Sequence, residues 1–161
     1  MVDAHAVDVR RYLYRRLGGT ADPASTADDL TADVLVIAWR RRADIPADAE
    51  LPWLYAVARR VLANWRRRPQ DVLVADLGDL DAIDEADPAE IVSQDVALAD
   101  AWRSLTPRDR EVLRLVAWEG LSGAQLATAL GISEGGAAAA LSRARARFEE
   151  SLAGMQGMPA S

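Results

Sequence analysis

The sequence predicts an all-α protein of two small helical domains joined by an acidic linker. Apolar residues recur at helical spacing in two separate blocks, neither block shows the alternation of a strand, and the charge changes abruptly between them. Residues 1–68 hold 12 arginines and 9 acids, residues 69–96 hold 9 acids and no base, and residues 97–161 hold 7 of each. We therefore expect domains over 1–68 and 97–152, a linker over 69–96 and a disordered tail over 153–161.

The first block predicts three helices. One apolar stripe ends where two glycines, Gly18-Gly19, follow it: Val9, Tyr12, Leu13 and Leu17. Thr26 with Asp29 three residues later resembles a capping box and predicts the start of a helix over residues 26–41. A proline-flanked loop then precedes a third helix, which we predict from Pro52 on. Its stripe is the most regular in the chain: Leu54, Val57, Ala58, Val61, Leu62 and Trp65.

The second block predicts a helix-turn-helix. Capping residues and glycines mark its elements. Thr106-Pro107 predicts the start of a helix that ends at Gly120, and Ser122 with Gln125 predicts the start of a short helix through Leu130. Gly131 then makes the turn, and Ser133 caps a last helix over residues 134–150. Two short helices joined by a turn containing glycine are typical of proteins that place the second helix in the DNA major groove.

The composition excludes several classes of function. The chain has 161 residues, no cysteine, and one histidine, His5, near the N-terminus. Thiol nucleophiles, disulfides and metal sites built on cysteine or histidine are therefore excluded, and we expect no catalytic site, no metal and no cofactor. No apolar run approaches the roughly 20 residues that span a bilayer, and the first residues lack the apolar core of a signal peptide. We expect a cytoplasmic protein that does not insert into a membrane.

Aromatic and arginine residues are interleaved along residues 53–68, a pattern typical of surfaces that stack unpaired bases and neutralise phosphates. Trp65 falls on the apolar stripe and is expected in the core. Trp53 and Tyr55, at the start of the helix, fit the core and the surface equally well. In the preceding helix, Trp39 lies opposite the apolar stripe, where an exposed tryptophan marks a contact surface.

Taken together, the two blocks resemble the extracytoplasmic-function sigma factors of bacterial RNA polymerase. TADDLTADVLVIAWRRR is similar to the family's polymerase-binding helix, and LPWLYAVARRVLANWRRR to its −10 promoter helix. LTPRDREVLRLVAWEGLSGAQLATALGISEGG is similar to its −35-binding domain. The resemblance implies a dissociable promoter-specificity subunit. Its implied partners are core RNA polymerase and promoter DNA, with an anti-sigma factor as a further candidate.

The resemblance assigns candidate residues to three contacts. Polymerase binding is assigned to one helix face: Asp28, Asp29, Asp33 and Trp39. Contacts with −10 DNA are assigned to the loop over residues 43–51 and to six side chains after it: Trp53, Tyr55, Arg59, Arg60, Asn64 and Arg67. Contacts with −35 DNA are assigned to the start of the last helix: Ser133, Glu134, Ala137, Ala138, Ala140, Leu141, Arg143 and Arg145.

The chain departs from the family pattern at two places. Arg60 stands where Asn or a similar small polar residue is usual, which predicts a different −10 base preference. In the last helix, the usual V-G-T-V-K-S-R-L-H-R-A becomes EGGAAAALSRA, so Ala138 and Ala140 replace Lys and Arg. Alanine contacts a thymine methyl group but donates no hydrogen bond to guanine. We therefore expect weak −35 readout, with the −10 region carrying most of the discrimination.

Two other interpretations stay open. The second block is also similar to the output domain of LuxR-type regulators, which would make the chain a stand-alone helix-turn-helix regulator. Those proteins carry an α/β domain upstream, whereas residues 1–68 show no strand pattern. The alanine-rich last helix also fits a degenerate sigma-like protein that binds polymerase or an anti-sigma factor but no longer reads promoters. An enzyme is disfavoured, because the remaining carboxylates form no inward-looking cluster in the sequence pattern.

Overall fold

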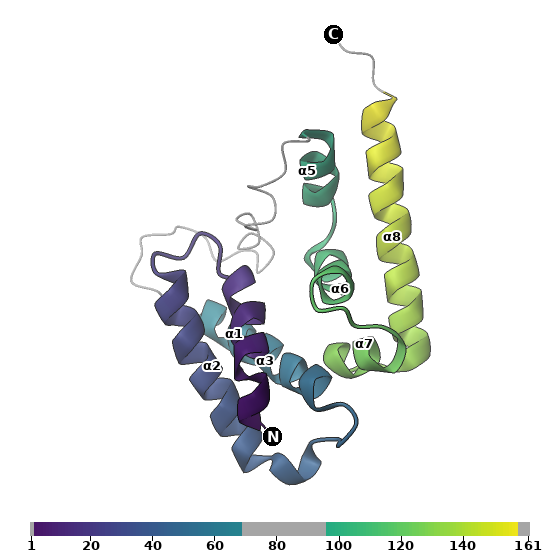
Figure 1. Cartoon of the computed structure of the whole chain (residues 1–161). Coiled ribbons are helices and arrows are strands. Elements are labelled where there is room, and N and C mark those ends of the chain that lie inside the picture. Colours follow the sequence, from purple (N-terminus) through teal and green to yellow (C-terminus); the bar gives the residue numbers. More distant parts are fainter. Residues whose placement is uncertain (1, 69–95, 158–161) are drawn as a thin grey trace. The chain divides into compact units, whose positions relative to one another are not determined.

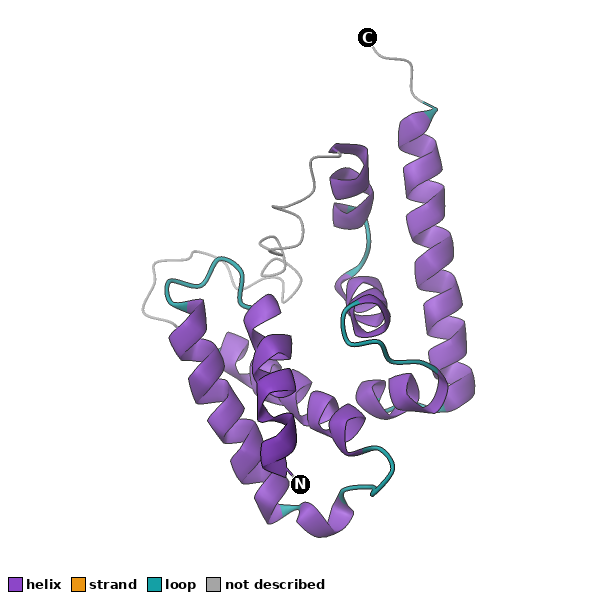
Figure 2. Cartoon of the chain, in the orientation of Figure 1, coloured by secondary structure: helices purple, strands orange, loops and turns teal. Residues whose placement is uncertain are grey.

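The structure, a computed structural model, describes residues 2–68 and 96–157. Over these ranges it contains helices and loops and no strand (Figure 1, Figure 2), which confirms the predicted all-α class. The described residues form two compact units, one before and one after the segment 69–95. The predicted linker falls on this segment and lies outside the described residues, except for Val96, which begins a helix. Residues 158–161 of the predicted tail also lie outside them.

The first unit is a bundle of three helices, each of which packs against the other two (Figure 1). They are α1 (Ala6–Arg15), α2 (Pro23–Arg40) and α3 (Glu50–Arg67), with short 3-10 turns η1 (Val2–His5) before α1 and η2 (Arg42–Asp44) after α2. The core contains apolar side chains that the helical stripes predicted: Val9, Tyr12, Leu13, Leu17, Leu30, Val34, Leu54, Val57, Ala58, Val61 and Leu62.

The start of α2 differs from the prediction. Asp22, and not Thr26, is the N-cap, and its side chain accepts a hydrogen bond from the Ser25 backbone N–H (3.1 Å). Pro23 follows at the first helical position, where its fixed φ and missing N–H suit a helix start. Thr26 already lies inside the helix, and its hydroxyl donates to the Asp22 carbonyl (2.8 Å). The acids at positions 28 and 29 therefore stand beyond the first turn.

The other two helices of the first unit also have boundaries that differ from those predicted. α1 ends at Arg15, before Leu17, which is buried in the turn that follows. α3 begins at Glu50, before the predicted start at Pro52, so Pro52 lies within its first turn. A proline is accommodated there because a first-turn N–H has no partner within the helix. The predicted loop over residues 43–51 is correspondingly shorter.

A buried arginine connects α1 to α3. Arg16 is 6% exposed; its guanidinium lies 3.6 Å from the Tyr12 ring centroid and donates to the Tyr12 carbonyl (3.0 Å). The Tyr12 ring in turn stacks on Tyr55 of α3, with 5.1 Å between centroids. Arg66, near the end of α3, donates to the Arg16 carbonyl (2.8 Å). α1 is thus held to α3 at two points, by ring stacking and by a hydrogen bond.

The second unit confirms the helix-turn-helix prediction. It consists of α5 (Val96–Arg103), α6 (Pro107–Ala117), α7 (Gly123–Leu130) and α8 (Glu134–Gln156), and α5, α6 and α7 each pack on α8 (Figure 1). The hydroxyl of Thr106 accepts from the Asp109 N–H (3.1 Å) and that of Ser133 from the Gly136 N–H (3.0 Å). Gly131 makes the turn with φ +67°, a conformation that favours glycine.

Two predictions for the second unit are wrong in detail. Ser122 is the N-cap of α7, but its side chain makes no capping hydrogen bond, so the expected capping box is not formed. α8 continues to Gln156, into the segment predicted as a disordered tail. It continues because Phe148, Leu152 and Met155 keep the helical spacing and are half-buried.

An ion pair connects the start of α6 to the middle of α8. The Asp109 carboxylate is buried, 5% exposed as a residue, and both of its oxygens accept from the same terminal nitrogen of Arg147 (2.7 and 3.0 Å). Arg147 follows Arg143 and Arg145, which are assigned to DNA, along the same helix. Its guanidinium lies on a carboxylate of its own unit.

Replacing Arg147 by Ala is therefore expected to destabilise the second unit by about 1–3 kcal/mol, because a buried acceptor loses its charged donor. Arg143→Ala is the matched control, since Arg143 is exposed on the same helix, and a change within about 0.5 kcal/mol is expected there. Urea unfolding followed by circular dichroism measures both. Equal stabilities for the two variants would show that the pair contributes nothing.

Candidate functional site

The outer face of α2 combines apolar and acidic side chains. Trp39 is 66% exposed and Val36 48% exposed, and helical spacing places them on the face opposite the buried Leu30–Val34 stripe. Asp29 and Asp33 are exposed, about two turns and one turn before Val36. The Arg42 guanidinium lies 4.9 Å from the Trp39 ring centroid. Trp39 is thus exposed, as expected, and Asp29 and Asp33 lie exposed on earlier turns of the same helix.

Asp28 differs from the other two acids of this helix. Its carboxylate accepts from the Arg10 Nε at 2.5 Å, so it is already paired with α1. This hydrogen bond, and then the charge of Asp28, raise the pKa of Arg10 above its usual value. Of the four residues assigned to polymerase binding, Asp28 therefore has the strongest competing interaction within the chain.

One exposed face of α3 carries four of the six side chains assigned to −10 DNA. Trp53, Arg60, Asn64 and Arg67 are spaced by seven, four and three residues, which places them on one side of a helix. Arg60, Asn64 and Arg67 are exposed, and Trp53 is half-buried. Arg59 lies at the edge of this face and is also half-buried. An aromatic ring followed by two guanidinium groups along one face can stack a base and hold the adjoining phosphates.

Tyr55 does not belong to that face, and its assignment to base stacking is corrected. The residue is 4% exposed, and its ring is stacked on Tyr12 inside the bundle. Two residues on an α-helix are about 200° apart, so Trp53 and Tyr55 cannot both face outward. Trp65 lies on the side of the apolar stripe, but it is half-buried and not in the core, where it was expected.

Arg41 is a candidate that the sequence analysis did not assign to DNA. Its guanidinium carbon lies 5.5 Å from the Trp53 ring centroid, and its Nε donates to the Asp44 carboxylate (3.1 Å). The only signal in the sequence was the run Arg40–Arg42 at the end of the helix, where cations also suit the negative end of the helix dipole. The contact with Trp53 depends on how α2 and α3 meet, which no local pattern shows.

The residues assigned to −35 DNA, at the start of α8, fall into a buried and an exposed group. Ala137 and Ala140 are 1% and 5% exposed and pack inside the helix-turn-helix, so their assignment to base contacts is corrected. Leu141 is half-buried. The remaining members of the set are exposed: Ser133, Glu134, Ala138, Arg143 and Arg145.

The part of α8 that points away from the core carries few hydrogen-bond donors. Helical spacing opposite the buried alanines selects Gly135, Ala138, Ala139 and Ser142, all of which are exposed or without a side chain. Arg143 and Arg145 stand on the two flanks of this face. The geometry suits phosphate contacts at the flanks, whereas Ser142 supplies the hydroxyl group at the centre.

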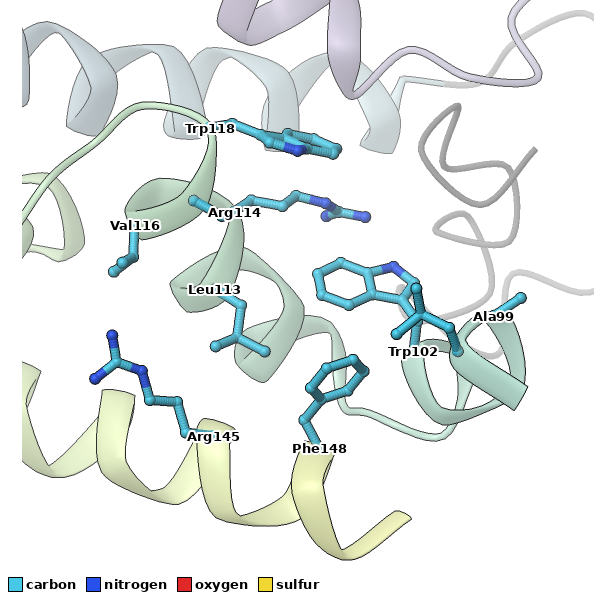
Figure 3. Close-up of a pocket in the computed structure, with 10 residues that line it drawn as sticks. Ala99, Trp102, Leu113, Arg114, Val116, Trp118, Arg145 and Phe148 are labelled. Atoms are coloured by element: carbon cyan, nitrogen blue, oxygen red, sulfur yellow. The ribbon is translucent and has the colours of Figure 1, made fainter. Parts of the chain in front are cut away.

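A groove of about 370 Å³ lies between α5, α6 and α8. Figure 3 shows the Arg114 side chain between the rings of Trp102 and Trp118, with the guanidinium 5.6 and 5.7 Å from the two centroids. Phe148 meets Trp102 edge to face, with 6.2 Å between centroids. The wall is otherwise mostly aliphatic, and Arg145 adds a second guanidinium. No sequence pattern indicated this groove, because α5 was not predicted as a separate helix.

The described residues show neither a metal-binding cluster nor a membrane span. No three histidine, aspartate or glutamate side chains among them come together where they could hold a metal ion. None of the described helices has the length and apolarity that crossing a bilayer requires.

Comparison with protein families matches both parts of the chain. Residues 1–71 match the family model described as sigma-70 region 2, and residues 95–148 match the model described as sigma-70, region 4. The two matches fall on the two units of the structure, in the order that the sequence patterns predicted.

Curated relatives extend the likeness over most of the chain. The ECF RNA polymerase sigma factor SigF of Caulobacter vibrioides is 36% identical over 141 residues, which cover 86% of this chain and 75% of that protein. BldN of Streptomyces coelicolor, also an ECF sigma factor, is 33% identical over 84% of this chain and 52% of its own length. SigL of Mycobacterium tuberculosis is 30% identical, with 84% and 77% covered.

Two solved structures share the fold. The sigma factor RpoE of Bartonella quintana, solved with the anti-sigma factor NepR, has a TM-score of 0.57 at 21% identity and covers 94% of this chain and 93% of its own. CnrH, solved with the cytosolic domain of CnrY, has a TM-score of 0.58 at 23% identity, with 95% and 85% covered.

The different burial of two alanines in α8 leads to a prediction. Ala140→Arg, which installs the residue usual in the resembling family, is expected to cost about 1–3 kcal/mol of stability, because it forces a long side chain into a packed position. Ala138→Lys is expected to change stability by less than about 0.5 kcal/mol, because position 138 is exposed. Urea unfolding of the two variants compares them. Greater destabilisation by Ala138→Lys would contradict this packing.

Proposed function

This chain belongs to the extracytoplasmic-function (ECF) sigma factors of the sigma-70 family, and we propose that it divides their task among the three surfaces described above. As an ECF sigma factor it binds core RNA polymerase and directs transcription from promoters. In our proposal, the outer face of α2 binds polymerase, α3 binds the melted −10 strand, and α8 binds the −35 duplex. The observation that carries this division is the single exposed face of α3 with Trp53, Arg60, Asn64 and Arg67.

The α2 face has the composition of a protein-binding surface. An exposed tryptophan beside an exposed valine supplies apolar area at the centre of a contact, and Asp29 with Asp33 would pair with basic groups of the polymerase at its edge. Such flanking charges add mainly to specificity and to the rate of encounter. We assign a smaller part to Asp28, because Arg10 already occupies its carboxylate.

The α3 face supports contact with unpaired bases. Stacking of a base on an aromatic side chain contributes about 1–3 kcal/mol per base, and Trp53 offers such a ring next to a line of guanidinium groups. Arg60 stands in the middle of this line, so it is the residue that we expect to set which −10 base is preferred. Arg67 and Asn64 extend the contact toward the end of the helix.

The α8 face supports a weaker contact with duplex DNA. With alanine and glycine at its centre, the helix can enter the major groove but presents few groups that distinguish guanine from other bases. Arg143 and Arg145 would hold phosphates on either side and fix the helix in register. This shortage of donors also favours the second candidate function, a sigma-like protein that binds its partners without reading promoters.

The groove between α5, α6 and α8 fits an apolar side chain from a protein partner. Leu98 lines this groove and is 39% exposed, and exposed apolar groups around a groove are typical of interaction sites. The two solved structures of similar fold are complexes with an anti-sigma factor and with the cytosolic domain of CnrY. We propose that a protein partner of this kind, acting in the cytoplasm, also binds this chain.

Run-off transcription with core polymerase tests the proposed function directly. Core polymerase plus this protein, supplied with genomic fragments, is expected to start transcripts at defined sites that core polymerase alone does not use. Polymerase binding without any new start site would instead support the sigma-like protein that no longer reads promoters.

The polymerase contact of α2 is tested by reversing two charges. Asp29→Arg with Asp33→Arg is expected to lower the amount of core polymerase that co-purifies with the chain, because both carboxylates stand on the binding face. Asp3→Arg with Asp48→Arg is the matched control, since it makes the same change in net charge at exposed positions outside α2. Equal recovery of polymerase with the two double variants would contradict the assignment.

The free protein is expected to bind duplex DNA poorly. Its net charge is −6, which gives a long-range repulsion from phosphates, and α8 contributes few base contacts. A mobility-shift assay with a promoter duplex should show little complex until core polymerase is added. Tight, salt-sensitive binding by the protein alone would favour a stand-alone regulator.

A further inference from the structure

Arg41 is held at the surface next to the ring that begins the −10 face. The guanidinium carbon lies 5.5 Å from the centroid of Trp53, so the end of α2 and the start of α3 meet at this pair. The Nε of Arg41 donates to Asp44 in η2 at 3.1 Å. The side chains of Arg41 and Asp44 are 49% and 57% exposed. The cation is therefore oriented by a neighbouring carboxylate and remains accessible to a ligand.

The adjacent arginine makes a different contact. Arg42 packs over Trp39 and donates to the Trp39 carbonyl (2.9 Å), so it belongs to the face that we assign to polymerase. Arg40 is exposed at the last position of α2. Of the three consecutive arginines, the structure brings Arg41 to the aromatic ring of α3.

We propose that Arg41 and Trp53 together seat one unpaired nucleotide of the −10 strand. The base stacks on the Trp53 ring, and the Arg41 guanidinium binds the phosphate beside it. Asp44 occupies the Nε–H and leaves the terminal N–H groups, whose fork geometry matches the oxygens of a phosphate. The inference rests on the proposed function and adds Arg41, a residue of the preceding helix, to the strand contact.

Binding of one nucleotide by Arg41 and Trp53 also places the −10 strand along the exposed face of α3. A strand held at Trp53 continues along the same side of the helix toward Arg60 and Arg67, so successive phosphates meet successive guanidinium groups. Arg41 stands at the beginning of this line. Its contribution is therefore electrostatic and local, and losing it should remove about one phosphate contact.

The test uses the complete complex of core polymerase with the full chain. The probe is a fluorescein-labelled single-stranded oligonucleotide with the −10 sequence of a promoter that the wild-type complex transcribes. We expect Arg41→Gln to lower the affinity about tenfold, as the loss of a charge-assisted hydrogen bond does. We also expect it to reduce the slope of log affinity against log salt by about 0.7, the value for one phosphate of a single strand.

Arg40→Gln is the matched control, since it removes the same charge one residue earlier. It is expected to leave the salt slope unchanged, whereas Arg41→Lys is expected to restore the slope because it keeps the charge. Arg41→Gln with the wild-type slope, or with the same effect as Arg40→Gln, would overturn the proposal. Circular dichroism of each variant confirms that the helices are retained, so that a loss of folding is not mistaken for a loss of binding.

The base contact is tested with the same probe by removing one base at a time. The affinity of the wild-type complex should fall when the base at one particular position is removed. For the Trp53→Ala complex, removing that same base should cause no further loss of affinity. If every abasic position affects the wild type and Trp53→Ala equally, the base is not seated on Trp53. A failure of the proposed function can be distinguished from a failure of this proposal. In the first case the wild-type complex starts no transcript, so it provides no promoter sequence for the probe.

Discussion

The second unit depends on how closely its helices approach α8. Ala137, Ala140 and Ala144 are 1%, 5% and 0% exposed, and their small side chains allow the neighbouring helices to pack near the α8 backbone. Packing of this density leaves no room for a longer residue at those positions. The opposite side of the same turns carries Gly135 and Ala138. The helix that would enter the major groove therefore has small side chains on both sides. The start of α8 is thus well packed on its inner side, whereas its outer side carries few groups that could read a base.

The first unit has the opposite character. Its core is also closely packed, with Arg16 and Tyr55 on either side of Tyr12, but its surface carries an exposed tryptophan on α2 and a line of arginines on α3. Unpaired bases expose ring faces that a duplex conceals, so stacking and phosphate contacts are effective there without specific donors. In our proposal the two units therefore supply different kinds of contact, and most of the promoter discrimination belongs to the first.

The sequence predicted those features that depend on a few neighbouring residues. Thr106, Ser133 and Gly131 were identified correctly because a cap or a left-handed turn is decided by the three or four residues around it. The start of α2 was predicted at Thr26, which fits a capping box, whereas Asp22 caps the helix four residues earlier. The side of a helix that becomes buried depends on its partner: Tyr55 could be placed only once Tyr12 was seen to stack on it. Tertiary packing also creates the contact of Arg41 with Trp53 and the groove between α5, α6 and α8. No local pattern predicts either of them.

Transcription from single-base promoter variants measures whether −10 contacts dominate promoter recognition. Initiation by core polymerase with this protein is measured on every single substitution of the −10 and −35 elements of one active promoter. We expect −35 substitutions to cost less than the roughly 1–3 kcal/mol typical of a mismatched base pair, and the largest losses to fall in the −10 element. Abolished initiation after −35 changes, with −10 changes tolerated, would contradict this expectation.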